Sequence, residues 1–432
     1  MSSGNRLVTS ETRTVKANRA VPSATTVVLV LLCLMYGITY IDRVNVSTAA
    51  LVFKQDLHLT NAQVGLVFSA FAYPYLMFTS FGGWLSDRFG ARLTLTISAL
   101  IWGGATLVTS LASTFNAMLV ARVVLGFGEA ATFPIATRAM CEWVPARKWA
   151  FAQGITHSSS RLGTAITPPL VAWLMAWISW RGSFVVLGIL SIVWAVIWYV
   201  YFRDDPATHP AITLRELEAL TTKVATKRAP VPWLRLSYRM LPVTLVYFCY
   251  GWTLWLYLAW IPSYFLHNYH LDLKESAIFS AGVFWAGVVG NTVGGIASDA
   301  ILRKTRNRNK ARRDLVVGGF LCSLVFTIMI FSARNLALAA LCLSGAFFFS
   351  EFTVGPLWAI PMDITPEFSG SASGLMNIGS PLAAIVSPLI FGYLIDKTGS
   401  WNDPFFGSIL VLLCGSITAF WMKPEQEFHL PN

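Results

Sequence analysis

Long runs of apolar residues constrain the fold of this chain more than any other feature of its sequence. Twelve runs are each about 18 residues or longer, and an α-helix of roughly 20 apolar residues spans the hydrocarbon core of a bilayer. Only 12% of the residues are charged, about half the share usual in a soluble globular protein. We therefore predict an all-α membrane protein with twelve transmembrane helices. The predicted helices cover residues 25–51, 62–84, 94–112, 117–140, 149–172, 182–202, 239–265, 276–298, 314–332, 336–358, 370–394 and 404–422.

The distribution of positive charge predicts how these helices are oriented. The net charge is +11, and most Lys and Arg residues fall in loops on one side of the predicted membrane, including "RKTRNRNKARR" at 303–313. Positive residues concentrate in cytoplasmic loops, so the excess indicates orientation rather than nucleic-acid binding. We predict a multi-pass membrane protein with a cytoplasmic N-terminal tail (1–24) and a cytoplasmic C-terminal tail (423–432). The six cysteines show no CxxC spacing, so no disulfide framework, zinc site or other cofactor is expected.

Motifs recur at matching places in the two halves of the chain. The hydrophilic segment 203–238 separates six predicted helices from six, giving an N-terminal bundle (25–202) and a C-terminal bundle (239–422). "GEAATFP" places Glu129 five residues before Pro134, and "SEFTVGP" places Glu351 five residues before Pro356. Likewise, "GGWLSDRFGAR" (82–92) matches "GGIASDAILRK" (294–304). We predict two pseudo-symmetric six-helix bundles, a layout of many secondary transporters, whose binding sites lie between the repeats.

Ionisable residues inside the predicted membrane helices are the main indication of a functional site. A charge at the centre of such a helix costs roughly 2.5–3.5 kcal/mol, so it usually faces a cavity. The six candidates are Asp42, Arg43, Arg122, Glu129, Arg161 and Glu351. Helical periodicity predicts a cavity-facing stripe of hydroxyls and a guanidinium on the first helix, formed by Tyr36, Tyr40, Arg43 and Ser47. Asp42 lies about 100° from that stripe, so we expect it to face a neighbouring helix or the cavity edge.

The fourth predicted helix supplies groups for a proton switch. Arg122, Gly126 and Glu129 share one face, and the glycine is expected to leave room for Arg122 to approach the acid. We predict that Arg122 pairs with whichever of Asp42 and Glu129 is ionised. Arg138, near the end of the same helix, is expected to extend to the membrane interface.

The balance of charge predicts the class of substrate. On the fifth helix, His157 and Arg161 are one turn apart, and arginine presents a planar fork that matches a carboxylate. Three central arginines face three acids, so protonation of the acids leaves a positive cavity that favours an organic anion. Arg161 suits either a diacid or a firmly held monoacid, and His157 either packs or contacts substrate. The alternative is an array of structural ion pairs, although buried pairs are costly and stabilise weakly.

The repeated glycine-rich loop predicts a gate. Gly83 allows close approach, Asp87 can cap a helix N-terminus, and Arg88 and Arg92 can reach acids or helix ends across the seam between the bundles. Asp299 is the matching acid in the second copy. The alternative is that these are solvated loop charges that only set orientation.

These motifs carry a family resemblance that covers nearly the whole chain. "GGWLSDRFGAR" resembles the signature loop of the major facilitator superfamily. "ITYIDRVNVS", "ARVVLGFGEAATFP", "WIPSYF" and "SGLMNIGSPLAAIVSP" together resemble its anion:cation symporter family, which includes galactonate, glucarate and hexuronate transporters. The resemblance implies that Asp42 and Glu129 carry protons, and that Arg122 couples them to transport. It also implies that Arg43 binds the substrate carboxylate, with Tyr40 and Tyr75 as hydroxyl donors.

The chain departs from the sugar-acid pattern at two places in the expected pocket. It has Pro381 where relatives often have asparagine, although Asn377 is present one turn earlier, and it has Arg161 where relatives often have an amide or small residue. In the aromatic stretch 249–265 of the seventh helix, we expect Trp255 or Tyr250 to reach the pocket.

We predict a secondary transporter, not an enzyme, that imports a small organic anion by proton symport with alternating access and functions as a monomer. The expected substrate is a sugar acid such as a hexonate, hexarate or hexuronate, and the partners are this anion, the proton and the lipid bilayer. Aromatic or dicarboxylic acids are the alternative substrates. A drug/proton antiporter would need fewer cavity arginines, and a non-transporting receptor would not need the duplicated loops. No metal-ligand cluster or phosphate-binding motif supports an enzyme.

Overall fold

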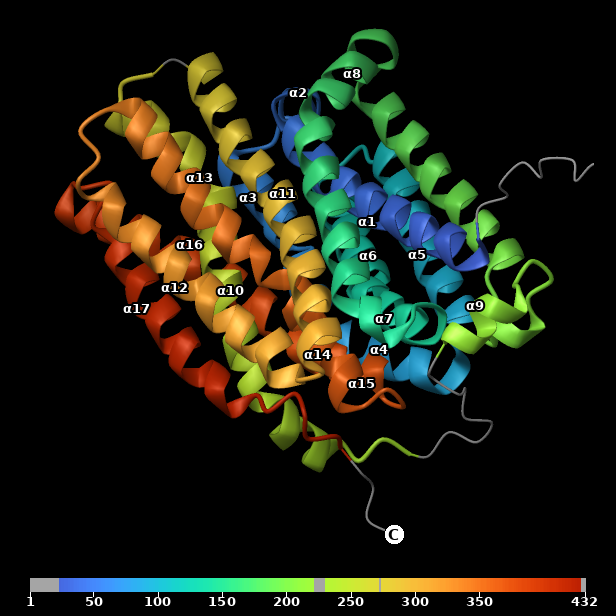
Figure 1. The fold of residues 1–432 in the computed structure, drawn as a ribbon. Helices are drawn as coiled ribbons and strands as arrows, with labels where there is room; N and C mark the ends of the chain where they lie inside the picture. Colours follow the sequence, from blue (N-terminus) through green and yellow to red (C-terminus); the bar gives the residue numbers. More distant parts are fainter. Residues whose placement is uncertain (1–22, 221–229, 272, 429–432) are drawn as a thin grey trace, which may run out of the picture.

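The computed structural model describes residues 23–220, 230–271 and 273–428 of the 432-residue chain, and that part is helical throughout its core (Figure 1). The first half contains α1 (Ala24–Thr48), α2 (Ala50–Asp56), α3 (Asn61–Ser69), α4 (Ala72–Phe89), α5 (Ala91–Ser110), α6 (Phe115–Ala130), α7 (Thr132–Trp143), α8 (Trp149–Tyr201) and α9 (Leu214–Ala219). The second half contains α10 (Trp233–Asn268), α11 (Leu273–Thr305), α12 (Leu315–Ile330), α13 (Leu336–Phe352), α14 (Val354–Ile364), α15 (Ser369–Asn377), α16 (Gly379–Thr398) and α17 (Pro404–Thr418). Short 3₁₀ turns lie at Ala146–Lys148, Pro206–Thr208 and Ala419–Trp421, and a π-helical turn lies at Asn309–Asp314.

The helices account for twelve membrane crossings. Within the described residues, eleven stretches are long and apolar enough to span a bilayer. One of them, Ala146–Tyr201, has 56 residues and contains non-helical backbone at Ile178 and Ser179, so it forms two spans joined by a sharp bend. This hairpin rises above the other helices in Figure 1. The predicted spans are thus all present, although α10 extends beyond the predicted 239–265 at both ends.

Several spans consist of two helices joined at a short break. The repeated motifs predicted from sequence lie at two such breaks, at Ala131 between α6 and α7 and at Thr353 between α13 and α14. Pro134 and Pro356 follow directly, each in the first turn of the second helix, where proline's missing N–H leaves no helix hydrogen bond unmade. Glu129 and Glu351 therefore occupy matching positions just before a break.

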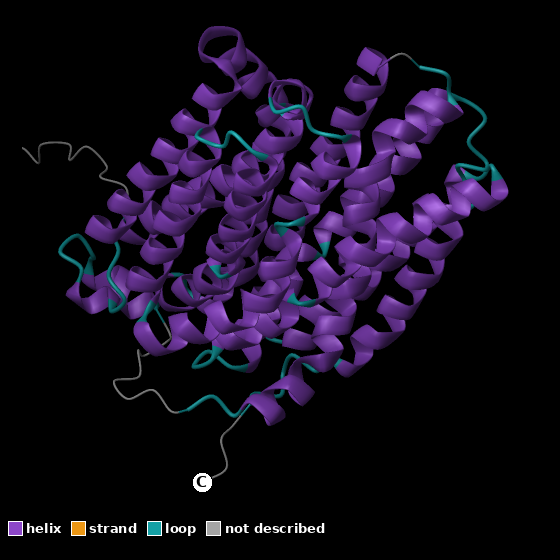
Figure 2. Cartoon of the chain, turned by 180° about the vertical axis from the view of Figure 1, so that it is seen from behind, coloured by secondary structure: helices purple, strands orange, loops and turns teal. Residues whose placement is uncertain are grey.

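The helices form two bundles that meet along a long seam (Figures 1 and 2). At the seam α4 packs on α15, and α8 packs on α11. Glycines allow this approach: a Cβ on Gly83 would overlap the backbone oxygen of Gly370, and one on Gly295 would overlap that of Ala150. Large apolar side chains remain exposed on the outer surface of the bundles, as lipid contact requires, for example Ile97, Val196, Leu241 and Leu410.

One end of the molecule carries the segments 145–148, 203–213 and 303–313, and we call it the basic side. It is the lower side in Figure 1, where α9 and the start of α15 lie. The bend at Ile178 and Ser179 lies on the opposite side. The predicted tail 1–24 falls almost entirely outside the described residues.

Candidate functional site

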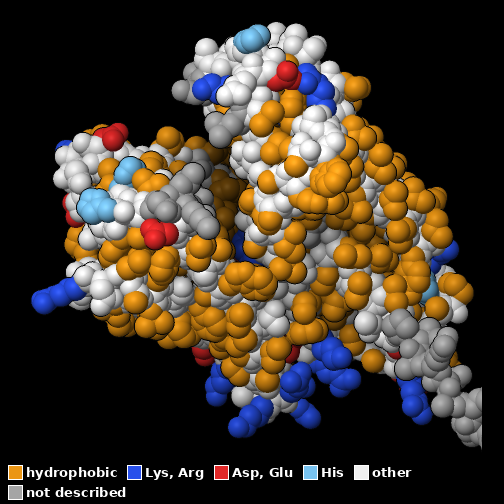
Figure 3. All heavy atoms as spheres, turned by 90° about the horizontal axis from the view of Figure 1, so that it is seen from above, with side chains coloured by type: hydrophobic (Ala, Val, Ile, Leu, Met, Phe, Trp, Pro, Cys, Tyr) orange, Lys and Arg blue, Asp and Glu red, His pale blue; other side chains and the backbone are white. Residues whose placement is uncertain are grey.

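A cavity of about 480 Å³ lies between the two bundles, within the size range of small-molecule sites. The seven residues predicted to bind substrate all line it: Tyr40, Arg43, Tyr75, His157, Arg161, Trp255 and Asn377. Gly65 and Phe68 of α3 and Pro388 of α16 also line it, so the cavity extends away from the basic side. Seen from above, the surface is hollowed between two lobes, with a Lys or Arg side chain visible deep in the hollow (Figure 3).

Arg43 is held at the cavity wall by Glu129. Its Nε donates to Glu129 Oε2 at 2.5 Å, and Glu129 is fully buried whereas the Arg43 side chain is 12% exposed. Nη2 of Arg43 and Oε1 of Glu129 have no hydrogen-bond partner among the described residues. The guanidinium carbon lies 4.8–5.3 Å from the centres of four aromatic rings, within the range of cation–π attraction; these belong to Tyr40, Phe71, Tyr75 and Phe133.

The predicted pairing of Arg122 with a carboxylate is wrong in this conformation. Among the described residues Arg122 forms no ion pair; it is buried, and its guanidinium carbon lies 5.2 Å from the centre of the Phe71 ring. Gly126 does not give it room, because the backbone oxygen of Phe71 occupies the space that a Cβ on Gly126 would need. Asp42 faces the neighbouring helix α8, where it accepts a hydrogen bond from Ser191 Oγ at 3.0 Å. A neighbouring helix was one of the two placements predicted for Asp42, the other being the cavity edge.

Arg161 contacts a polar cluster from the other bundle. Its Nη2 donates to Tyr250 OH at 3.0 Å, and its Nε lies 3.2 Å from Glu351 Oε2. Glu351 also accepts from Tyr250 OH at 3.0 Å and from Asn291 Nδ2 at 2.6 Å. Arg161 is 2% exposed and Glu351 is fully buried. This ion pair joins α8 of the first bundle to α13 of the second.

The remaining predicted cavity residues lie at the seam. Asn377 Nδ2 donates to Tyr75 OH at 3.3 Å and to Thr79 Oγ1 at 2.9 Å, which connects α15 to α4. Trp255 Nε1 donates to Ser380 Oγ at 3.1 Å within the second bundle. His157 is buried, and its Nε2 has no hydrogen-bond partner among the described residues.

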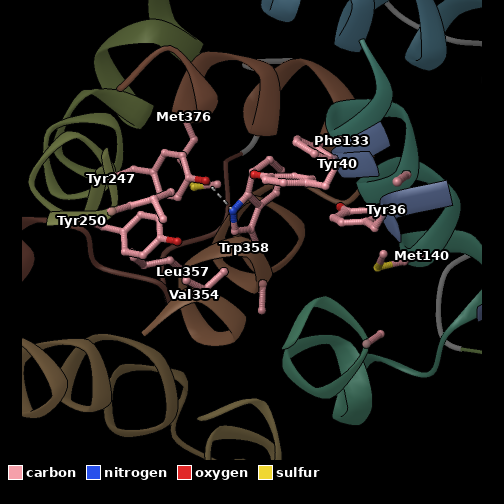
Figure 4. Close-up of a cluster of buried hydrophobic side chains, with 14 of the residues drawn as sticks. Tyr36, Tyr40, Phe133, Met140, Tyr247, Tyr250, Val354, Leu357, Trp358 and Met376 are labelled. Atoms are coloured by element: carbon pink, nitrogen blue, oxygen red, sulfur yellow. Dashed lines mark hydrogen bonds between the residues drawn. The ribbon is translucent and has the colours of Figure 1, made fainter. Parts of the chain in front are cut away.

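An aromatic cluster below the cavity was not predicted from the sequence. Trp358 of α14 donates from Nε1 to Tyr247 OH at 3.0 Å, and its ring centre lies 6.2 Å from that of Phe133 and 5.1 Å from that of His157. Figure 4 shows Trp358 between the tyrosines of α10 and the rings of Tyr36, Tyr40 and Phe133. Trp358 lies two residues after Pro356, and its position beside the repeated motif was the one feature of the sequence that could have indicated this cluster. Tyr36 is fully buried in this cluster and Ser47 bonds its own helix, so only Tyr40 and Arg43 of the predicted stripe line the cavity.

On the basic side, two aspartates bind helix N-termini of the opposite bundle. Asp87 accepts from the backbone N–H groups of Gly370 and Ser371 at 3.1 and 2.6 Å, and from Ser371 Oγ at 2.6 Å. Asp299 accepts from the N–H groups of Ala150 and Phe151 at 3.3 and 2.7 Å. A carboxylate at a helix N-terminus is stabilised by unpaired N–H groups and the helix dipole. We call these two contacts the Asp87 latch and the Asp299 latch.

On the basic side, the predicted arginines Arg88 and Arg92 do not contact the opposite bundle among the described residues, whereas Arg138 does. Arg92 stays within its own bundle, where Nε donates to the Tyr199 carbonyl at 2.9 Å, and Arg88 lies over Trp84 and Phe89 of its own helix. Arg138 crosses instead: Nη1 donates to the carbonyls of Pro366 and Glu367 at 2.9 and 2.8 Å. It is 3% exposed, so the expectation that it reaches the interface is wrong, because Glu142 of its own helix binds Nη2 and carbonyls of the second bundle bind Nη1.

Comparison with known proteins identifies the family. Residues 32–388 match the family model described as "Major Facilitator Superfamily". The chain belongs to the major facilitator superfamily. This major facilitator is 44% identical over 409 residues to the "Probable sulfoacetate transporter SauU" of Cupriavidus necator, covering 94% of this chain and 95% of that protein. It is 28% identical over 408 residues to the "Hexuronate transporter" of Bacillus subtilis, covering 94% of each. It is 29% identical over 386 residues to the "D-galactonate transporter" of Escherichia coli O6:H1, covering 86% of this chain and 89% of that protein.

A solved structure supports the fold. The crystal structure of the E. coli fucose:proton symporter FucP matches with a TM-score of 0.69 at 12% identity, covering 93% of this chain and 99% of that chain. The predicted fold class, twelve helices in two six-helix bundles, is confirmed. The resemblance to organic-anion transporters is confirmed as well, and the chain is a multi-pass membrane transporter rather than an enzyme.

Proposed function

We propose that this major facilitator imports a small organic anion together with protons by alternating access. The observation that carries the proposal is the Arg43–Glu129 pair at 2.5 Å, set in the cavity wall with one guanidinium nitrogen unpartnered among the described residues. The names of its relatives support an anionic substrate, since they are given as transporters of sulfoacetate, hexuronate and galactonate. The protein acts as a monomer in a bacterial inner membrane, with bundles 25–202 and 239–422 and linker 203–238, and its basic side and both termini face the cytoplasm.

Arg43 is the anchor for the substrate in this proposal. A bidentate guanidinium–carboxylate pair is strong and directional, and the four surrounding rings fix the orientation of the fork. The relative with 44% identity favours a short sulfonated carboxylate such as sulfoacetate, whereas the sugar acids expected from the sequence correspond to relatives near 28–30% identity. Arginines from both α1 and α8 line the cavity, which disfavours a drug/proton antiporter that binds cations.

Glu129 is the proton carrier most directly coupled to the substrate. When an anion takes Arg43, the fully buried Glu129 loses the partner that balances its charge. An uncompensated buried charge is strongly destabilising, so the carboxylate takes a proton from water on the open side of the cavity. Release of this proton on the other side restores the pair with Arg43 and expels the anion. Asp42, held by Ser191, and Arg122, beside Phe71, supply a second acid and a second positive charge next to this exchange.

Uptake into proteoliposomes tests the proposal. We expect sulfoacetate, or a hexonate or hexarate, to accumulate when the outside is acidic and to stop accumulating when a protonophore collapses the gradient. Glu129→Gln should abolish this accumulation but retain exchange of labelled for unlabelled anion, because the amide cannot carry a proton. Glu218→Gln, at an exposed position in the linker on the basic side, is the matched control and should transport like wild type. Loss of both accumulation and exchange in Glu129→Gln would exclude the coupling role.

A further inference from the structure

A second arginine–carboxylate pair lies at the cavity, formed by Arg161 and Glu351. Unlike the Arg43–Glu129 pair, it joins the two bundles, and it is shielded from solvent on both sides. Nη1 of Arg161 has no hydrogen-bond partner among the described residues although Arg161 lines the cavity. A buried guanidinium nitrogen with no hydrogen-bond partner, on a residue that lines a cavity, is suited to an acceptor that is not part of the chain.

The two pairs are arranged to act on one small molecule. Glu129 and Glu351 hold matching positions in the repeat, each just before a helix break. The guanidinium carbons of Arg43 and Arg161 lie 4.9 and 5.4 Å from the centre of the same ring, Tyr40, so they are no farther apart than the sum of those distances. A compact molecule with an acidic group at each end can reach both guanidiniums at once.

We propose that Arg161 binds a second acidic group of the substrate and that Glu351, displaced from Arg161, carries a second proton. This inference rests on the proposed function and narrows its substrate to dianions. No covalent bond changes: the second carboxylate or sulfonate replaces Glu351 at Arg161, and Glu351 takes a proton from water on the open side. Tyr250 and Asn291 remain as hydrogen-bond donors to Glu351, so the protonated side chain keeps hydrogen-bond partners in its buried position.

The groups around the pair allow this exchange. Facing Glu351 are Arg161 of α8, Tyr250 of α10 and Asn291 of α11, and Arg161 is the one cation among these partners. Around Arg161 lie His157 one turn earlier and the Tyr40 ring, neither of which supplies a compensating negative charge. Because Glu351 belongs to the second bundle, its release also removes the ion pair between the bundles beside the cavity and leaves the Arg161–Tyr250 hydrogen bond. A monoanion held by Arg43 alone leaves this link closed.

The test uses purified protein in proteoliposomes with anions that carry one or two acidic groups. The probes are sulfoacetate and galactarate as dianions, and galactonate as the monoanion matched to galactarate. Proton coupling is measured from the pH gradient at which the net flux of each anion is zero at a fixed anion gradient and zero membrane potential, because an anion that moves with one proton per acidic group carries no net charge. Glu351→Gln should move one proton fewer per dianion than wild type. Arg161→Gln should lower the apparent affinity for the dianion by at least about tenfold, as expected when a charged hydrogen bond is lost, and change that for galactonate less than about threefold.

A matched control separates proton carrying from a structural strut. Tyr250→Phe removes the hydroxyl that bonds both members of the pair but keeps both charges, so the inference predicts unchanged proton coupling. If either single variant is unstable in detergent, the double variant Arg161→Gln/Glu351→Gln removes the pair without leaving a lone charge. It should transport galactonate and lose preference for galactarate.

Three outcomes overturn the inference. They are wild-type proton coupling in Glu351→Gln, equal behaviour of Glu351→Gln and Tyr250→Phe in every measurement, and transport of galactonate but of neither dianion by the wild type. The last leaves the proposed function intact. Failure of the wild type to accumulate any of the three anions under a pH gradient would instead count against the proposed function itself.

Discussion

Replacing Asp87 with Asn should open the basic side of this transporter. Asp87 is buried and accepts three hydrogen bonds from the first turn of α15, while Arg138 Nη1 lies 3.9 Å from its Oδ1. Asn keeps the shape but removes the charge and presents an N–H₂ group to backbone N–H groups that also donate. A hydrogen bond to a charged group contributes about 1.5–3 kcal/mol net. Loss of one such contribution shifts the equilibrium toward opening by roughly tenfold to a hundredfold, since 1.4 kcal/mol is a factor of ten.

Cys141 provides a built-in reporter of that opening. It is 1% exposed, and its Sγ donates to the Pro366 carbonyl across the seam at 3.7 Å. With the other five cysteines (Cys33, Cys249, Cys322, Cys342 and Cys414) changed to Ala, the rate at which a maleimide labels Cys141 measures how often the bundles separate on the basic side. We expect Asp87→Asn to raise this rate by about tenfold or more. Asp299→Asn should act in the same direction, because Asp299 also accepts from two backbone N–H groups at a helix N-terminus of the opposite bundle, although it is ion-paired with Arg312 of its own bundle as well.

The control is Asp314→Asn, since Asp314 is partly exposed and bonds only its neighbour Arg313 among the described residues. It should leave the labelling rate unchanged. If Asp87→Asn also leaves the rate within about threefold of wild type while the protein remains monodisperse, the latch contributes less than 1 kcal/mol. The interpretation of this loop as a gate would then be wrong, and its charges would serve orientation only.

The other predictions concern substrate binding, seam packing and pH. Arg43→Lys keeps the charge but loses the planar fork, so substrate affinity in uptake assays should fall at least about tenfold; unchanged affinity would remove Arg43 from the site. Gly83→Ala should raise Cys141 labelling because the added Cβ overlaps the Gly370 oxygen, whereas Gly104→Ala, with open space around its Cα, should not. Burial, and to a lesser extent the charge of Arg203, lowers the pKa of His209 in the folded protein. As pH falls below about 6.5, His209 is therefore protonated in the unfolded chain before it is protonated in the folded protein. The stability that neutral His209 contributes is therefore present above that pH and lost below it, and His209→Gln should flatten the fall in melting temperature between about pH 7.5 and 5.5.

The sequence alone was sufficient to predict which parts of the chain cross the membrane and, of the four residues expected on the cavity face of the first helix, it placed Tyr40 and Arg43 correctly. Apolar runs set the spans, and the 3.6-residue period placed Tyr40 and Arg43 on one face and Asp42 on another. The period describes one helix at a time. It cannot say which neighbouring helix supplies a partner, and for that reason the acid on α6 was assigned to Arg122 of its own helix rather than to Arg43 of α1.

The contacts across the seam were the least predictable from sequence. Arg138 donates to carbonyls more than two hundred residues away in the chain, and its local ion pair with Glu142 one turn later does not indicate that it crosses the seam. Arg88 and Arg92 lie in the recognisable loop, yet the helix-end geometry directs them to their own bundle. Asp87 was predictable because a buried cap needs only an acid and a free helix N-terminus, and the repeat supplied both twice.

The energies of these contacts fit a transporter that is held closed on the basic side until its cavity is filled. Two latches at about 1.5–3 kcal/mol each hold α4 on α15 and α8 on α11, and the bundles must break both to separate there. Reversing a two-state population from 1:99 to 99:1 requires about 5.5 kcal/mol, which is the size of the two latches together. An anion that replaces Glu129 at Arg43 supplies part of this free energy only if Glu129 is protonated. Otherwise the cost of an unpaired buried carboxylate would cancel the free energy gained from the pair between Arg43 and the anion. Proton uptake and anion binding are therefore each insufficient alone in our proposal, and this mutual dependence is what makes the transport coupled.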